Sequence, residues 1–363
     1  MFVCLNYFQK TIDSKGKKCY NKDTGKTSAK VSPEINHRLK GNRLMNSISQ
    51  ASPLVKWREK KERNILIADK MMDAGFEERG KRMRFCGTFL VQSRCPDCGK
   101  STISSANLCR DRLCPTCSWR LSLRRFAEMC STMQLLTDID TYDAGFLTLT
   151  VRNCHPSQLR FTLQKMAEDW NRMLAQRSVK GKIWGWAKSL EITYNKRTNT
   201  FHPHYHIIML TNPNGMSQAQ LHFFFREKWR VATRLPYEPI TDYRTIGAFE
   251  HRDEGGIDGE AMAKAVLETY KYSVKSDELK GMPLDVFREF VTAISGIRFC
   301  TYGGAIKEAR KQLGYKDTDA ATLEGDDTIR IKCDCGGNMV DEFLQWSFTD
   351  GEYKHLKEVM KVG

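Results

Sequence analysis

The chain has 363 residues, 40% of them hydrophobic, which is enough to build a real core and excludes disorder throughout. It contains no run of eighteen uncharged apolar residues and no apolar leader with a small-residue cleavage site, so we expect a soluble cytoplasmic protein with no membrane partner. A net charge of +15 favours a polyanionic partner.

The excess of positive charge lies at one end of the chain. Residues 1–130 hold 27 Lys and Arg against 12 Asp and Glu, whereas residues 131–363 hold 31 of each kind. Such a block predicts an electrostatic footprint for nucleic acid, and a solvated, solubilising segment is the alternative. Residues 1–50 are polar and lack apolar periodicity, so we expect a flexible basic arm there.

A cysteine-rich segment flanked by helices follows in residues 51–130. Segment 55–76 places apolar residues at helical spacing, and segment 119–136 has the pattern of a basic amphipathic helix. Thirteen cysteines in a chain of this size without an export signal indicate reduced thiols and metal ligands rather than disulfides.

Two Cys-x-x-Cys turns separated by fifteen residues predict a structural zinc site. Two residues between thiolates let one tight turn offer both sulfurs to a tetrahedral ion. Redox cysteines are the alternative, and Cys86 could replace one of the four or help to hold a second ion. The C-terminal Cys333-Asp-Cys335 is too closely spaced to predict zinc. The predicted ligands are Cys95, Cys98, Cys114 and Cys117, with Cys109 as a further candidate.

The zinc site is expected to stabilise the fold and to position basic side chains for contact with phosphate. Contacts of this kind fix the position of a nucleic acid and carry no sequence information directly. The candidate DNA-binding residues are Arg110, Arg112, Arg120, Arg124 and Arg125.

Strands and helices interleave in residues 131–314. Segment 146–151 has the pattern of a buried strand, and strands 188–195 and 202–210 flank a Lys-Arg-Thr-Asn turn, which predicts a hairpin. This organisation predicts an α+β domain built on an antiparallel sheet flanked by helices. Residues 315–363 are expected to form a C-terminal tail. The expected helices cover 156–176, 217–234, 259–276 and 283–313.

Three histidines alternate along one predicted strand. Period-two geometry puts His202, His204 and His206 on one face, where imidazoles in line could chelate a divalent ion. Hairpin pairing would bring Glu191 alongside, so we predict a site formed by His204, His206 and Glu191. Added carboxylate oxygen makes Mg²⁺ or Mn²⁺ plausible ions. The alternative is a set of hydrogen-bonded core histidines.

A glutamate and a tyrosine share one face of the predicted helix 259–276. Glu268 and Tyr272 are four residues apart, Lys275 follows one turn later, and Tyr270 faces elsewhere. A phenol is a weak nucleophile near neutral pH, and a nearby base, cation or metal-polarised phosphate would make it effective. An ordinary surface helix is the alternative.

In chain order these motifs form a series: LCRDRLCPTCSWRLSLRR, FLTLTVRN, SLEITYN, HPHYHIIM and ETYKYSVK. The series resembles the HUH endonucleases, and within them the rolling-circle replication initiators of small bacterial plasmids. The resemblance runs from about Trp57 to Gly314 and makes 131–314 the expected HUH nuclease domain. His204-Tyr205-His206 matches the histidine-hydrophobe-histidine motif, and Tyr272-x-x-Lys275 matches the nucleophile motif.

The resemblance implies a metal-dependent, site-specific endonuclease and strand transferase. Tyr272 would attack one phosphate of single-stranded or hairpin origin DNA, leaving a 5′-phosphotyrosine and a 3′-hydroxyl. Glu268, which precedes Tyr272 by four residues as in single-tyrosine initiators, would activate water at termination. A host helicase and a DNA polymerase would be partners. Two alternatives stay open, an HUH-type transposase and a non-catalytic zinc-dependent nucleic-acid-binding regulator.

Overall fold

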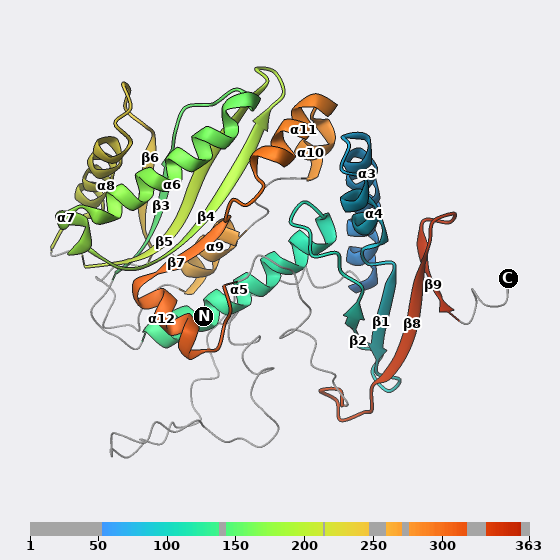
Figure 1. Ribbon diagram of the computed structural model, residues 1–363. Coiled ribbons are helices and arrows are strands. Elements are labelled where there is room, and N and C mark those ends of the chain that lie inside the picture. Colours follow the sequence, from blue (N-terminus) through green and yellow to red (C-terminus); the bar gives the residue numbers. More distant parts are fainter. Residues whose placement is uncertain are drawn as a thin grey trace, which may run out of the picture.

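The computed structural model describes residues 53–137, 143–212, 215–246, 259–270, 276–317 and 332–356. The predicted basic arm, Tyr272 and Lys275 lie outside these residues. The described chain forms two antiparallel sheets with helices around them, which confirms the α+β prediction (Figure 1). Within these residues, no helix is both long enough and apolar enough to cross a membrane.

The larger sheet has five strands, all paired antiparallel, in the order β6-β3-β5-β4-β7. Its centre is the predicted hairpin. The two strands extend a few residues beyond the expected limits, because their pairing continues from Asn195↔Thr200 at the turn to Ile183↔Thr211 at the far end. The strands are β3 (Asp143–Thr150), β4 (Ile183–Asn195), β5 (Thr200–Thr211), β6 (Thr241–Ile246) and β7 (Cys300–Gly303).

Helices cover both faces of this sheet. On one face, Trp170 of α6, Phe225 of α8 and Phe287 of α11 join a core with Tyr205 and Ile207 of β5. These helices are α6 (Leu159–Ala175), α8 (Gln218–Thr233) and α11 (Leu284–Ala293), with the short η1 (Pro156–Gln158) and α7 (Arg177–Lys180) beside them. The opposite face packs on α5 (Pro115–Thr137), α9 (Gly259–Tyr270) and α12 (Gly304–Gln312).

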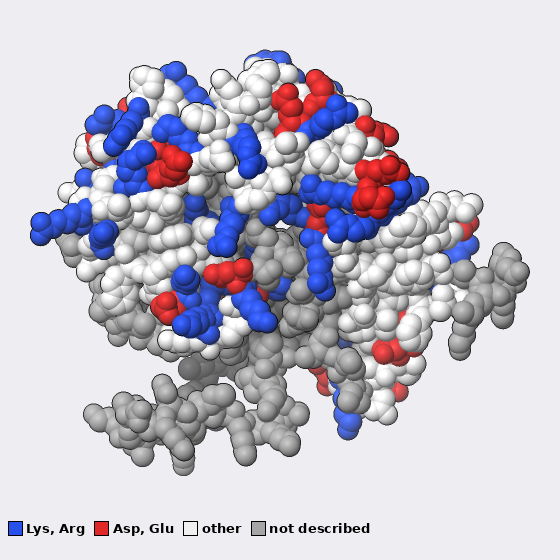
Figure 2. Space-filling view, in the orientation of Figure 1, with Lys and Arg blue, Asp and Glu red and all other residues white. Residues whose placement is uncertain are grey.

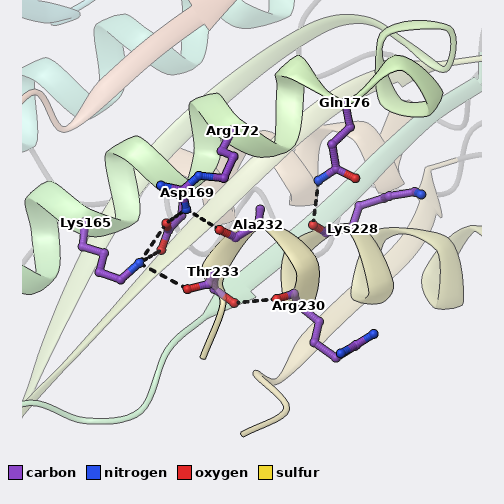
Figure 3. Close-up of polar contacts among 8 residues, drawn as sticks. All are labelled: Lys165, Asp169, Arg172, Gln176, Lys228, Arg230, Ala232 and Thr233. Carbon is purple, nitrogen blue, oxygen red and sulfur yellow. Dashed lines mark hydrogen bonds and ion pairs between the residues drawn. The ribbon is translucent and has the colours of Figure 1, made fainter. Parts of the chain in front are cut away.

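A buried carboxylate fixes α8 against α6. The Asp169 side chain is 1% exposed and accepts hydrogen bonds from Lys165 Nζ at 3.0 Å and Arg172 Nη1 at 2.6 Å. The same two cations donate to the carbonyl oxygens of Thr233 and Ala232 at the C-terminal end of α8 (Figure 3). Cations stabilise the C-terminal end of a helix, where the carbonyl groups are exposed. Asp169 therefore stabilises α8 indirectly, because it positions Lys165 and Arg172 at that end.

The smaller sheet joins distant parts of the chain in the order β2-β1-β8-β9. Residues 340–355, expected to belong to a tail, instead supply two of its four strands, and β8 pairs with β1 from Phe89↔Gln345 to Arg94↔Val340. Leu90, Leu344 and Trp57 form a small core beneath it. The elements here are α3 (Pro53–Asp73), α4 (Glu77–Phe85), β1 (Phe89–Arg94), β2 (Ser101–Ala106), β8 (Val340–Ser347) and β9 (Glu352–His355).

The short helix α10 (Ser276–Gly281) connects the two parts of the structure. Lys70 of α3 donates to the carbonyl oxygens of Leu279 at 2.8 Å and Lys280 at 2.9 Å, at the C-terminal end of α10. Glu278 accepts a hydrogen bond from the backbone N–H of Tyr194 on β4 at 3.0 Å. The residues that directly follow 271–275 are therefore tied to both the cysteine-rich part and the central hairpin.

Candidate metal centres

The strand register brings three potential ligands to one face of the large sheet. Glu191 on β4 lies directly opposite His204 on β5, and Thr148 on β3 lies opposite His206. Since side chains alternate between the faces of a sheet, Glu191, His204 and His206 all lie on the face that also carries Ile208. That face packs on α5 and α9.

The three side chains are close enough to bind one ion. Glu191 Oε2 lies 3.3 Å from His204 Nε2 and 3.0 Å from His206 Nε2. Ligand atoms from the three residues lie within 4.8 Å of one another, and their side chains are only 6%, 12% and 9% exposed, respectively. Two imidazoles and a carboxylate together can bind a divalent ion such as Mn²⁺.

Neighbouring groups orient both imidazoles. His204 Nδ1 lies 3.2 Å from the carbonyl oxygen of His202, which can only accept, so Nδ1 carries the proton and leaves Nε2 as a ligand atom. His206 Nδ1 lies 3.3 Å from Thr148 Oγ1, and the ring stacks on Phe146 with centroids 5.5 Å apart. Contacts of this kind are what holds metal-binding histidines in place.

His202 is on the same strand face but lies outside the three-residue group. Its ring stacks on that of His204 with centroids 5.3 Å apart. Burial, and then the neighbouring His204, lower the pKa of His202 below its usual value. A neutral imidazole beside His204 adds no charge to the site.

Helix α9 carries one predicted catalytic residue to the edge of this group. Glu268 Oε1 lies 3.9 Å from His206 Nε2, and the Glu268 side chain is 44% exposed. Tyr270, in contrast, is 4% exposed within the core between α9 and the sheet, and burial raises the pKa of its phenol. A buried phenol held in its protonated form is a poor nucleophile, which agrees with the expectation that Tyr270 faces elsewhere.

Eight of the cysteines that the structure describes form two groups of four, so the predicted site of Cys95, Cys98, Cys114 and Cys117 is wrong in its grouping. One group contains Cys114 and Cys117, and the other contains Cys95 and Cys98. The two Cys-x-x-Cys turns are separated because Cys95 begins the β1–β2 turn while Cys114 and Cys117 lie at the start of α5. The first group is Cys86, Cys109, Cys114 and Cys117, and the second is Cys95, Cys98, Cys333 and Cys335.

A buried lysine lies beside the first cysteine group. Lys61 is fully buried and donates to the carbonyl oxygens of Arg84 at 2.6 Å and Cys86 at 2.8 Å, and to Thr88 Oγ1 at 3.1 Å. Burial lowers its pKa to about 8, against the opposing effect of the nearby cysteines. Its ammonium group is placed to offset negative charge on those sulfurs.

Two of the predicted DNA-binding arginines are buried, so the expectation that they face phosphate is wrong. Arg120 and Arg125 are each 8% exposed, and the Arg120 guanidinium lies 5.8 Å from the ring centroid of Trp119. Arg124 pairs with Glu128, and Arg112 donates to a backbone carbonyl at 2.6 Å.

On the face seen in Figure 2, Lys and Arg gather over α6, α7 and α8, whereas the surface over β8 and β9 carries few charges.

Residues 100–354 match a protein family described as replication protein. This span includes β4 and β5, which carry Glu191, His204 and His206, and helix α9. The chain belongs to this replication protein family. It is 32% identical over 301 residues to a protein of Bacillus amyloliquefaciens named Protein rep, a match that covers 76% of this chain and 86% of that one.

Two further relatives of this replication protein also carry the name Protein rep. One, from Streptococcus pneumoniae serotype 2, is 28% identical over 276 residues, covering 74% of this chain and 82% of the relative. The other, from Lentilactobacillus hilgardii, is 27% identical over 327 residues, covering 86% and 98%. No solved structure matches the chain.

Sequence patterns missed several residues of these centres. Thr148 is a hydroxyl residue between two leucines of a buried strand, and that interruption was a signal that it meets a polar partner. The sequence allows Cys86 as a possible replacement ligand, whereas Cys333 and Cys335, which come from the far end of the chain, are not predicted to bind zinc. The grouping of Cys333 and Cys335 with Cys95 and Cys98 depends on pairing between β1 and β8, which no local pattern encodes.

Proposed function

We propose that this replication protein initiates rolling-circle replication of a plasmid by nicking and rejoining single-stranded origin DNA. The observation that carries the proposal is the group of Glu191, His204 and His206, with Glu268 of α9 at its edge. Membership of the replication protein family supports a role at an origin. Single-stranded or hairpin origin DNA is then the substrate, with a host helicase and a DNA polymerase as partners.

Glu191, His204 and His206 are the residues that would hold a divalent ion such as Mg²⁺ or Mn²⁺. Such an ion, when bound, polarises a phosphate oxygen and is worth several kcal/mol of charge stabilisation. The protein's own contribution is to fix the ligand directions, through the His202 carbonyl and the Thr148 hydroxyl. It also keeps the ligand side chains largely away from solvent.

Tyr272 is the proposed nucleophile. Its phenol oxygen forms a bond to phosphorus while the bond from phosphorus to the upstream 3′ oxygen breaks. The phenol proton leaves and the 3′ oxygen gains one, so the products are a 5′-phosphotyrosine and a free 3′-hydroxyl that a polymerase can extend. Lys275, three residues after Tyr272, is proposed to offset phosphate charge.

Glu268 is the proposed general base for termination. Its carboxylate is partly exposed and lies close to His206, so a water molecule beside the bound phosphate is within its reach. The base removes a proton from that water, and the water oxygen forms a bond to phosphorus at the regenerated site while the bond from phosphorus to the upstream 3′ oxygen breaks. The 3′ oxygen gains a proton, so the products are a 3′-hydroxyl and a 5′-phosphate. Water replaces a second tyrosine in this scheme, which is why one tyrosine suffices.

The division of labour predicts different defects for the two residues. Glu268→Ala should leave the first cleavage within a few-fold of wild type and reduce termination by about 10²-fold or more. A random single-stranded library with Mn²⁺ identifies a cleavable sequence, and a substrate with two copies then reports both steps. Glu289→Ala, an exposed glutamate on α11, is the control. Equal loss of both steps in Glu268→Ala would contradict the assignment.

The same library separates the proposal from its rivals. A non-catalytic regulator would bind the strands and leave no covalent product. A transposase of the same nuclease class would join element ends in a strand-transfer assay, whereas an initiator supports replication of a plasmid that carries the cleaved sequence.

We propose in addition that Cys86, Cys109, Cys114 and Cys117 hold a structural zinc ion. Lys61→Met should then lower the free energy of unfolding by about 3 kcal/mol, because the buried carbonyl oxygen of Cys86 and the partly buried one of Arg84 lose their donor. It should also speed loss of zinc from this group. Thermal unfolding and zinc release measure the two effects, with the exposed Arg63→Met on the same helix as control. Unchanged stability and zinc retention would contradict the role of Lys61.

A further inference from the structure

The second cysteine group brings together two turns from opposite ends of the described chain. Cys95 and Cys98 lie in the turn between β1 and β2, and Cys333 and Cys335 lie just before β8. The sulfur of Cys95 is 3.5 Å from that of Cys335, and the sulfur of Cys98 is 3.4 Å from that of Cys333. All four are free thiols, and the four sulfurs lie within 4.8 Å of one another.

We propose that Cys95, Cys98, Cys333 and Cys335 form a second tetrathiolate zinc site, separate from that of Cys86, Cys109, Cys114 and Cys117. A Zn–S distance of about 2.3 Å in a tetrahedron requires sulfurs about 3.8 Å apart. The two sulfur separations above are close to this value. A four-iron cluster would need the sulfurs to be farther apart, so a single ion fits the group better than a cluster.

The backbone around these four cysteines is shaped for such a site. Each pair is followed by a glycine in the left-handed region, Gly99 with φ 72° and Gly336 with φ 91°. This conformation lets the chain turn back directly after the second sulfur of each pair. At Gly337, a Cβ atom would lie 3.0 Å from the Cys95 sulfur and 2.1 Å from Asp97 Oδ2. A side chain at this position would press on the Cys95 sulfur and displace Asp97, so glycine suits the close approach of the two turns.

Further contacts bring the two turns to the same end of the smaller sheet. Arg94, directly before Cys95, pairs with Val340 at the start of β8, and Lys100 Nζ lies 3.7 Å from Asp334 Oδ2. Both charged partners are more than half exposed, so this ion pair contributes little stability by itself. The pairing between β1 and β8 is also short. A shared ion would supply much of the free energy that keeps the C-terminal strands on β1.

The position of β8 and β9 gives this site a structural consequence. Tyr353 of β9 donates to the carbonyl oxygen of Gly87 at 2.6 Å, and the backbone N–H of Trp346 donates to Thr88 at 2.8 Å. Gly87 directly follows Cys86, a member of the first cysteine group. The second ion would therefore hold in place the hairpin that covers one ligand of the first.

Counting thiolate-bound zinc in the full chain tests this proposal without reference to nicking activity. A mercurial thiol reagent displaces zinc from sulfur, so ions on carboxylate and imidazole are not counted. We expect two zinc ions per wild-type chain and one for the double variant Cys333→Ser, Cys335→Ser. Cys130→Ala with Cys154→Ala removes two buried thiols that belong to neither group and should retain two. One ion in the wild type, or two in the Cys333/Cys335 variant, would overturn the second site.

A measurement on the wild-type protein covers the case in which the variant does not fold. During gradual zinc removal, alkylation followed by mass spectrometry should show Cys95, Cys98, Cys333 and Cys335 becoming reactive together. Their reactivity should appear at a different chelator concentration from that of Cys86, Cys109, Cys114 and Cys117. Alkylation of Cys333 and Cys335 in the zinc-loaded chain, with Cys95 and Cys98 protected, would contradict the proposal. So would iron in place of zinc.

Discussion

Replacement of Tyr272 by Phe is expected to abolish covalent attachment of single-stranded DNA. The substitution removes only the hydroxyl, and the proposed phosphorus–oxygen bond cannot form without it. Non-covalent binding of the same strand should stay within about two-fold of wild type, since phosphate contacts dominate that affinity. Denaturing gels with labelled DNA measure attachment, and equilibrium binding in the absence of divalent ions measures affinity.

Tyr270→Phe is the matched control for this result. It removes an identical hydroxyl two residues away, from a side chain that is buried in the core between α9 and the sheet. We expect attachment within a few-fold of wild type, with any loss explained by stability. Should Tyr270→Phe abolish attachment while Tyr272→Phe retains it, the assignment of the nucleophile is wrong.

Removal of one imidazole from the metal group is expected to have the second-largest effect. His206→Ala should slow cleavage by about 10²- to 10⁴-fold, because several kcal/mol of charge stabilisation correspond to that range. Glu191→Gln keeps the shape of the side chain and loses its charge, so it should raise the Mn²⁺ concentration needed for half-maximal cleavage. Cleavage rates measured over a range of Mn²⁺ concentrations separate the two defects.

His155→Ala is the control for the metal group, because His155 is exposed, its ring contacts Ser157 at 3.0 Å, and it is not a member of the group of Glu191, His204 and His206. It should leave both the rate and the Mn²⁺ requirement unchanged. Full activity of His206→Ala at ordinary Mn²⁺ concentrations would show that the imidazoles serve only to pack the sheet.

Local patterns were sufficient to predict that Glu191, His204 and His206 lie together on the large sheet. Alternation along β5 places His204 and His206 on one face, and a short turn fixes which residue of β4 lies opposite them. Both facts depend on fewer than thirty consecutive residues. The same reasoning predicted the helices α3, α6 and α8 and the antiparallel character of the sheet.

Features that depend on distant pairing were not predictable in this way. The grouping of Cys95 with Cys335 requires β1 and β8 to be neighbours, although about 240 residues separate these two cysteines. Strand β7 is four residues long and was absorbed into an expected helical region, because so short a buried segment has no periodicity to measure. Burial of Arg120 results from packing beside Trp57 and Trp119, which the amphipathic pattern of its own helix does not show.

Peptide mapping of the covalent product tests the central claim most directly. The full chain is incubated with a cleavable single strand and Mn²⁺, digested with protease and nuclease, and searched by mass spectrometry for a peptide that carries a nucleotide. We predict one modified peptide, with a 5′-phosphate linked to Tyr272. A nucleotide on another side chain, or cleavage of the strand with no modified peptide, would contradict the proposed nucleophile.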